Sequence, residues 1–183
     1  EANRLGYKSR SAFKLLQIDE KFNFLKPGKK VIDLGCAPGG WLQVASKKVN
    51  SSEKNVSVFG VDLLPVTNIF GVKTIIGDVN DLTTEKKIID LVGTKPDIVL
   101  SDMAANTTGH KQTDHIRTSQ LTEIAFNFAV SNLNKGGVFL VKTFKGGSEI
   151  SIIDNMKKQF SYVKNIKPKA SRLESVETYT ICM

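Results

Sequence analysis

This sequence of 183 residues has few of the residues that cross-link small domains or bind metals. The positions of its two cysteines, Cys36 and Cys182, suggest neither a disulfide framework nor a zinc site, which favours a reducing compartment. Its two histidines, His110 and His115, are five positions apart and form no ligand pair, so we expect no metal. No uncharged apolar run approaches the roughly 18 residues of a membrane span, and we expect no membrane partner.

Acidic residues are also scarce relative to basic ones. The chain has 26 Lys and Arg against 18 Asp and Glu, a net charge of +8. This excess favours a polyanionic partner, nucleic acid before an anionic membrane surface, although charge alone also serves solubility. The length and the 40% hydrophobic content fit one domain with a sizeable core, so we expect a single domain over residues 1–183.

Apolar segments alternate with helical patterns along the chain, which predicts an α/β fold with a parallel sheet covered by helices on both faces. We expect helices at Ser9–Phe24, His115–Leu133 and from Glu149 to about Gln159. Asp114 is the predicted N-cap of the second of these. Its core-facing residues are expected to be Ile116, Leu121, Ile124, Ala125 and Phe128. Buried strands are expected at Val31–Leu34, Val56–Val61, Thr74–Ile76, Ile98–Leu100 and Val138–Val141. Two further strand candidates lie near Tyr162–Ile166 and Thr178–Cys182.

The first 29 residues stand apart from this alternation because they precede the first core strand. They contain the amphipathic helix Ser9–Phe24, with Leu15, Ile18 and Phe22 on one stripe. Residues 1–29 are therefore expected to form a helical extension packed beside the sheet.

A glycine loop follows the first strand, in the stretch 31–41. Its pattern is D-x-G-x-x-P-G-G, beginning at Asp33 and followed by Trp41. A dinucleotide fingerprint needs a second glycine two residues after the first, and Ala37 stands there instead. A strand, a loop and a helix in this order hold a small cofactor at the helix N-terminus.

Acids follow three successive strands. Asp33 ends the first, Asp62 the second, where it would suit a pair of ribose hydroxyls, and Asp78 follows the third, where it would suit an adenine amino group. Each alone could be an ordinary loop carboxylate. Together with the glycine loop they predict a nucleoside-bearing cofactor. A loop containing Pro38 and followed by Trp41 suits S-adenosylmethionine (SAM) better than a nicotinamide cofactor, whose pyrophosphate needs bare backbone amides.

Four further residues bear on the reaction. Asp102 follows the fourth strand and Lys142 closes the fifth, where a lysine is costly unless it is paired or functional. Lys14 lies on the N-terminal helix, and Glu177 opens the last strand. Taken singly, Lys14 and Glu177 are more often solvated surface residues.

With these residues the chain resembles the FtsJ-type family of RNA 2′-O-ribose methyltransferases, the heat-shock ribosomal RNA methyltransferase group. The matching segments are Arg10-Ser11-Ala12-Phe13-Lys14-Leu15, Asp33 through Trp41, Asp62-Leu63-Leu64-Pro65, Gly77-Asp78, Ser101-Asp102-Met103-Ala104, Val141-Lys142-Thr143-Phe144, and Ser171-Arg172 through Glu177. The resemblance implies a Rossmann-like, SAM-dependent methyltransferase fold, with a seven-stranded, mostly parallel sheet whose last strand is antiparallel.

The resemblance also implies the site. The family's Lys-Asp-Lys-Glu catalytic set falls on Lys14, Asp102, Lys142 and Glu177, although Glu174 competes for the last place. Lys142 is expected to contact the 2′-oxygen, as a base or as an orienting group. One departure from the family is Ala105, where ribosomal members usually have proline. The expected SAM-binding residues are Asp33, Gly35, Ala37, Pro38, Gly39, Gly40, Trp41, Asp62, Leu63, Asp78, Val79 and Asp102.

The expected substrate is a uridine of large-subunit ribosomal RNA, methylated within the large subunit by a monomeric enzyme that releases S-adenosylhomocysteine. Met103 and the stretch 106–109 favour this branch over transfer RNA anticodon loops or messenger RNA caps. An NAD-dependent oxidoreductase and a non-catalytic RNA-binding assembly factor are the rival interpretations.

The expected location is cytoplasmic. Because the sequence starts at Glu1, a trimmed targeting segment leaves mitochondrial, other organellar or nucleolar locations open.

Overall fold

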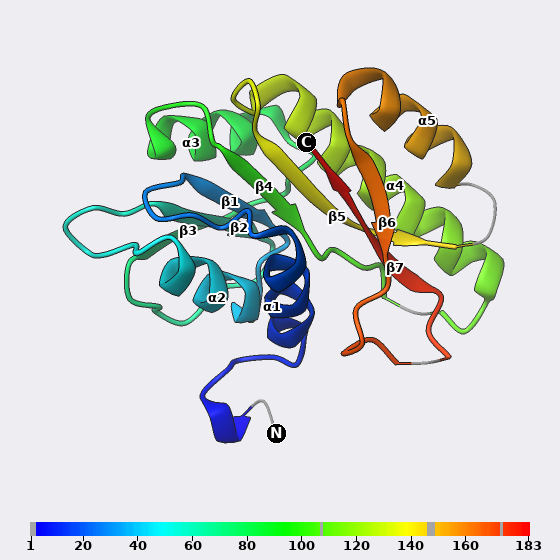
Figure 1. Ribbon diagram of the computed structural model, residues 1–183, viewed down its shortest axis with the longest axis horizontal. Coiled ribbons are helices and arrows are strands. Elements are labelled where there is room, and N and C mark those ends of the chain that lie inside the picture. Colours follow the sequence, from blue (N-terminus) through cyan, green and yellow to red (C-terminus); the bar gives the residue numbers. More distant parts are fainter. Residues whose placement is uncertain (1–2, 107, 146–148, 173) are drawn as a thin grey trace.

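The sheet of the protein has seven strands in the order β3-β2-β1-β4-β5-β7-β6 (Figure 1). The computed structural model describes residues 3–106, 108–145, 149–172 and 174–183, so Thr107 of the stretch 106–109 lies outside it. All pairings are parallel except those of β7, which runs antiparallel to both β5 and β6. This confirms the expected mostly parallel sheet with an antiparallel last strand. The strands are β1 (Val31–Leu34), β2 (Val58–Asp62), β3 (Val72–Ile76), β4 (Ile98–Ser101), β5 (Val138–Phe144), β6 (Val163–Ile166) and β7 (Glu177–Cys182).

Helices cover both faces of the sheet (Figure 1). Leu15 and Leu42, from α1 and α2, share one buried apolar cluster with strand residues, and Ile88, Phe128 and Met156, from α3, α4 and α5, share the cluster on the other face. Each face of the sheet therefore has its own core. A short 3₁₀ segment, η1 (Asn3–Leu5), precedes the helices α1 (Ser11–Phe22), α2 (Gly40–Lys48), α3 (Leu82–Val92), α4 (Lys111–Asn132) and α5 (Glu149–Gln159). In the described part of the chain, no helix is long and apolar enough for a membrane span.

Helix α1 is held against the body of the protein by a buried carboxylate near its C-terminal end. Asp19 accepts hydrogen bonds from the backbone N–H groups of Phe24 (3.1 Å) and Leu25 (2.8 Å), just beyond the helix. Its second oxygen lies 3.0 Å from Lys48 Nζ at the end of α2. A buried carboxylate is tolerated because these partners replace its water. The contacts fix the extension to α2, so α1 can carry a residue into the site.

Three local predictions about β3 and α4 were wrong. The strand at Thr74–Ile76 is an edge strand, not a buried one: β3 pairs only with β2, and Ile76 is 67% exposed. Asp114 is not an N-cap, because α4 begins one turn earlier with His110 at that position, and the Asp114 carboxylate accepts from Thr108 N (2.8 Å) and Oγ1 (2.7 Å). Ile116 is half exposed instead of core-facing, because it lies in the added first turns of α4.

The strand order also places the expected site. The chain leaves β1 toward β2 and β3 on one side, and β4 and β5 lie on the other side. Connections that diverge in this way open a crevice at the carboxyl ends of the strands, where ligands of open α/β sheets bind. Asp33 is in β1, Asp62 ends β2, Asp78 follows β3 and Asp102 follows β4, so all four acids lie at or near this edge.

Candidate active site

A cleft of about 660 Å³ lies at the carboxyl ends of β1 to β4. Half of its lining consists of residues expected to bind the cofactor: Gly35, Ala37, Asp62, Leu63, Asp78, Val79 and Asp102. The other half was not anticipated from the sequence: Leu64, Gly77, Met103, Ala104, Asn106, Leu121 and Ile124. Leu121 and Ile124 were assigned to the core-facing stripe of α4, since a residue that walls a ligand cleft has the same apolar pattern as one that packs in a core.

The glycine loop is shaped to leave this cleft open. Gly35 has a φ of +71°, and a Cβ there would lie 2.2 Å from Cγ of Met103, which lines the opposite wall. Asp62 then fixes the loop, because its carboxylate accepts from Ala37 N (2.8 Å) and from Leu64 N (2.9 Å). One acid therefore connects the loops after β1 and β2 and still lines the cleft. Asp78 similarly accepts from Asn80 N (2.9 Å).

Asp33 lies within β1 just before the glycine loop and is 1% exposed. Neither of its carboxyl oxygens has a hydrogen-bond partner in the described part of the chain. Burial first, and then the nearby carboxylates of Asp102 and Asp62, raise the pKa of Asp33 well above its ordinary value. A buried acid without a partner is costly in an isolated protein and indicates a position shaped by a ligand.

The structure does not bring Pro38, Gly39, Gly40 and Trp41 into the cleft lining. Trp41 is buried against α1 instead: its indole Nε1 donates to the backbone oxygen of Ser11 (2.9 Å), and its ring lies 5.7 Å from that of Tyr179. A Cβ on Gly40 would lie 2.1 Å from Ser9 Oγ. The second half of the glycine loop therefore supports α1.

The four expected catalytic residues come together in one chain of ion pairs. Lys142 Nζ lies 3.1 Å from Asp102 Oδ1 and 3.5 Å from Glu177 Oε1, and it also donates to the backbone oxygen of Asp102 (3.2 Å). Lys14 Nζ lies 3.3 Å from Glu177 Oε2. The strand expected at Val138–Val141 continues to Phe144, so Lys142 lies within β5 and does not close it. Glu177 opens β7, and because β7 is antiparallel its first residue pairs with Phe144 at the carboxyl end of β5, close to Lys142.

The electrostatics of this cluster are balanced between two lysines and two acids. Burial raises the pKa of Glu177, but the charges of Lys142 and then Lys14 outweigh it, and the pKa lies below its ordinary value. The Lys142 side chain is only 6% exposed, and its partners make that burial tolerable. Tyr179, which was not anticipated from the sequence, donates its hydroxyl to Asp102 Oδ1 (2.6 Å). Burial, followed by the Asp102 and Glu177 charges, raises the pKa of Tyr179, so the hydroxyl stays a donor.

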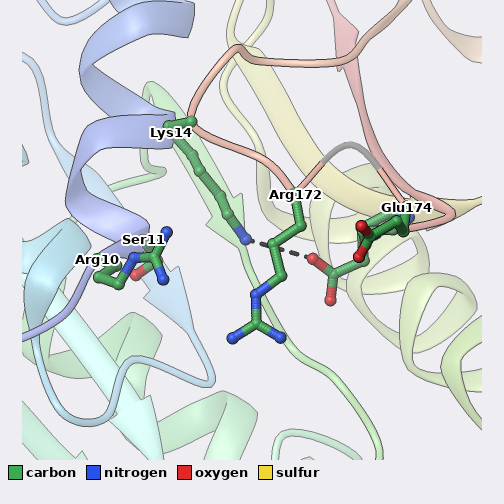
Figure 2. A pocket seen from close by; sticks show the side chains of 8 residues that line it. Arg10, Ser11, Lys14, Arg172 and Glu174 are labelled. Atoms are coloured by element: carbon green, nitrogen blue, oxygen red, sulfur yellow. Dashed lines mark hydrogen bonds and ion pairs between the residues drawn. The ribbon is translucent and has the colours of Figure 1, made fainter.

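A second pocket of about 510 Å³ lies on the other side of the tetrad, between α1 and the β6–β7 loop. Figure 2 shows Arg10 and Lys14 on its α1 side and Arg172 and Glu174 on its loop side. Lys14 and Glu177 belong both to this pocket and to the ion-pair chain, whereas Glu174 only lines the pocket wall. The geometry therefore favours Glu177 over Glu174 as the fourth member of the tetrad.

The strand order, the reversed β7 and the acidic cleft define a class: Rossmann-like, SAM-dependent methyltransferases. A neighbour in this fold is Aeropyrum pernix fibrillarin, described with natively bound SAM (TM-score 0.66, 14% identity, 95% of this chain and 76% of that one). The FtsJ-like methyltransferase model matches residues 7–183, and the chain belongs to that family.

Individual relatives agree with this assignment. The chain is 52% identical to ribosomal RNA large subunit methyltransferase E of Bartonella quintana over 178 residues, which is 97% of this chain and 74% of that protein. It is 51% identical to the protein of the same name from Mesorhizobium japonicum over 176 residues, 96% of this chain and 66% of that one. A Plasmodium falciparum structure described as a ribosomal RNA methyltransferase superposes with a TM-score of 0.83 at 31% identity, covering 96% of this chain and 97% of that one.

The residues of the cleft fit SAM. The adenosine part of SAM presents an amino group and a ribose diol, which match the acids Asp62 and Asp78 on the cleft wall. Its sulfonium carries a positive charge, which suits a cleft bordered by the carboxylate of Asp102. Gly35 leaves the room that a side chain would fill.

Proposed function

We propose that this protein methylates a ribose 2′-hydroxyl of RNA, most specifically a uridine of large-subunit ribosomal RNA. The observation that carries the proposal is the double position of Asp102. It lines the cofactor cleft, and its carboxylate contacts Lys142, so the tetrad begins where the cleft ends. The names of the relatives and the excess of basic residues support an RNA substrate.

The bound SAM supplies an electrophilic methyl group on a sulfonium sulfur. The chain's own residues must present the 2′-oxygen to it in line, and such positioning can account for much of the rate enhancement. Lys142 is placed to do this: its ammonium group, held by Asp102 and Glu177, can donate a hydrogen bond to the 2′-oxygen and stabilise negative charge that develops there. The proton of the 2′-hydroxyl then passes to water, because an ammonium group cannot accept it. Lys14 holds Glu177 from the other side.

The test is methyl transfer from tritiated SAM to large ribosomal subunits, transfer RNA and capped RNA, prepared from cells that lack the activity. We expect incorporation into large-subunit RNA that maps to a 2′-O-methyluridine. The variant Lys142→Ala should lose this incorporation while binding SAM normally, because Lys142 is absent from the cleft lining. Incorporation only into another RNA would keep the chemistry and refute the substrate. Methylation at a base atom would refute the ribose assignment.

A further inference from the structure

The pocket beside the tetrad is lined by two arginines that are not members of the ion-pair chain. Arg10 and Arg172 both line it, together with Lys14 and Glu177 of the tetrad. Both arginines are exposed, and they come from opposite walls, one directly before α1 and one from the β6–β7 loop. A guanidinium group is planar and presents a fork of donors that matches phosphate oxygens.

A hydrogen bond connects the two walls of the pocket. Gln17, on α1, accepts a hydrogen bond at its side-chain oxygen from the backbone N–H of Ala170 in the loop (2.9 Å). Within the loop, Ser175 N donates to the backbone oxygen of Arg172 (3.1 Å). The backbone two residues before Arg172 is therefore tied to α1, and the two arginines lie on facing walls of one pocket.

We propose that this pocket is a phosphodiester subsite, in which Arg10 and Arg172 bind the phosphate next to the target ribose. The inference rests on the proposed function. In RNA the 3′-phosphate is attached to the carbon beside the one that bears the 2′-hydroxyl. A 2′-oxygen held at Lys142 therefore brings a phosphate close to the tetrad, and the pocket that shares Lys14 and Glu177 with the tetrad presents the exposed guanidinium groups of both arginines there.

Glu174 has the opposite charge to the two arginines and should therefore have the opposite effect on RNA binding. Its exposed carboxylate lines the same pocket, three residues before Glu177, and a carboxylate repels a phosphate. Removing a positive charge from the pocket and removing this negative charge must therefore change RNA affinity in opposite directions. A purely structural role of the pocket would not produce that pair of effects.

The experiment measures the binding of large-subunit ribosomal RNA between 50 and 200 mM salt, with SAM affinity measured separately on each variant. We expect Arg10→Ala and Arg172→Ala each to weaken RNA binding roughly tenfold and to lower the salt slope by about one ion. Arg172→Lys should recover part of the loss, and Glu174→Gln should tighten binding severalfold. SAM affinity should stay unchanged, which also shows that the variants fold.

The matched control is Lys54→Ala. Lys54 is exposed in the loop before β2, at the amino edge of the sheet and thus away from the carboxyl-end site. The subsite is refuted if the arginine variants behave like this control, or if Glu174→Gln weakens binding. Failure of the proposed function is distinguishable: a wild-type protein that binds RNA with the arginine-dependent salt slope yet methylates no ribose would refute the function, whereas arginine variants that bind RNA like the control in an enzyme that methylates ribose would refute the subsite alone.

Discussion

Replacing Tyr179 by phenylalanine isolates one hydrogen bond beneath the tetrad. Tyr179 is fully buried, and its hydroxyl lies 2.6 Å from Asp102 Oδ1. The substitution removes one oxygen and leaves the ring against Trp41, so it creates no sizeable cavity. A hydrogen bond to a charged acceptor contributes about 1.5–3 kcal/mol. We therefore expect the free energy of unfolding to fall by about 2 kcal/mol, and the melting temperature of a domain of this size by about 4–8 °C.

Urea unfolding at neutral pH measures this loss, and a double-mutant cycle assigns it. Tyr179→Phe, Asp102→Ala and the double variant should show a coupling energy of at least about 1 kcal/mol, because both single changes break the same bond. Methyl transfer should also slow, by about tenfold, since Asp102 loses the hydroxyl that orients its carboxylate beside Lys142. A Tyr179→Phe protein that unfolds within about 0.5 kcal/mol of the wild type, or a coupling energy near zero, would refute the reasoning.

Three further changes test other parts of the structure. Gly35→Ala should weaken SAM binding more than about tenfold by titration calorimetry, because its Cβ would lie 2.2 Å from Met103 Cγ at a φ of +71°; unchanged affinity contradicts this. Since burial raises the pKa of Asp33, the folded state holds its proton more tightly, and stability falls as the pH rises above about 3.9 through the folded value. The unfolding free energy of Asp33→Asn relative to wild type should therefore increase from pH 5 to pH 8, and parallel curves would argue against it. Asp19→Ala should destabilise the protein by about 2–4 kcal/mol in urea, while Asp154→Ala, at an exposed pair, should have almost no effect; equal losses would contradict the role of Asp19.

The sequence predicted those features that depend on local pattern. The bounds of β1 match the prediction because a run of apolar residues between a polar turn and a glycine loop has few alternatives as a strand. The exposure of β3 could not be predicted from its own residues, because its place at the edge of the sheet depends on the strand order. Asp114 is a residue type that is favoured at helix N-caps, but the polar residues before it are also helical, so α4 begins at Lys111.

The site shows the same division. Asp102 and Lys142 could be predicted because Asp102 follows a buried strand and Lys142 lies within one, where a charged side chain needs a reason. The role of Tyr179 could not, because an aromatic residue in an apolar strand is ordinarily core, and only the pairing of β5 with β7 places its hydroxyl on Asp102. The resemblance left Glu174 in competition with Glu177, and the position of Glu177 at the start of the last strand favoured it; its contacts with both lysines give a physical reason for that choice.

The glycine loop serves both halves of the site, which explains why its pattern is longer than a cofactor alone requires. Gly35 and Ala37 face the cleft, whereas Gly40 admits Ser9 and Trp41 binds the backbone of Ser11. Those contacts fix the start of α1 one turn before Lys14. A change at the second half of the loop should therefore impair the tetrad through Lys14 and leave SAM affinity nearly intact, whereas a change at Gly35 should do the reverse. One loop thus sets both the position of the methyl donor and the position of the helix that completes the catalytic cluster.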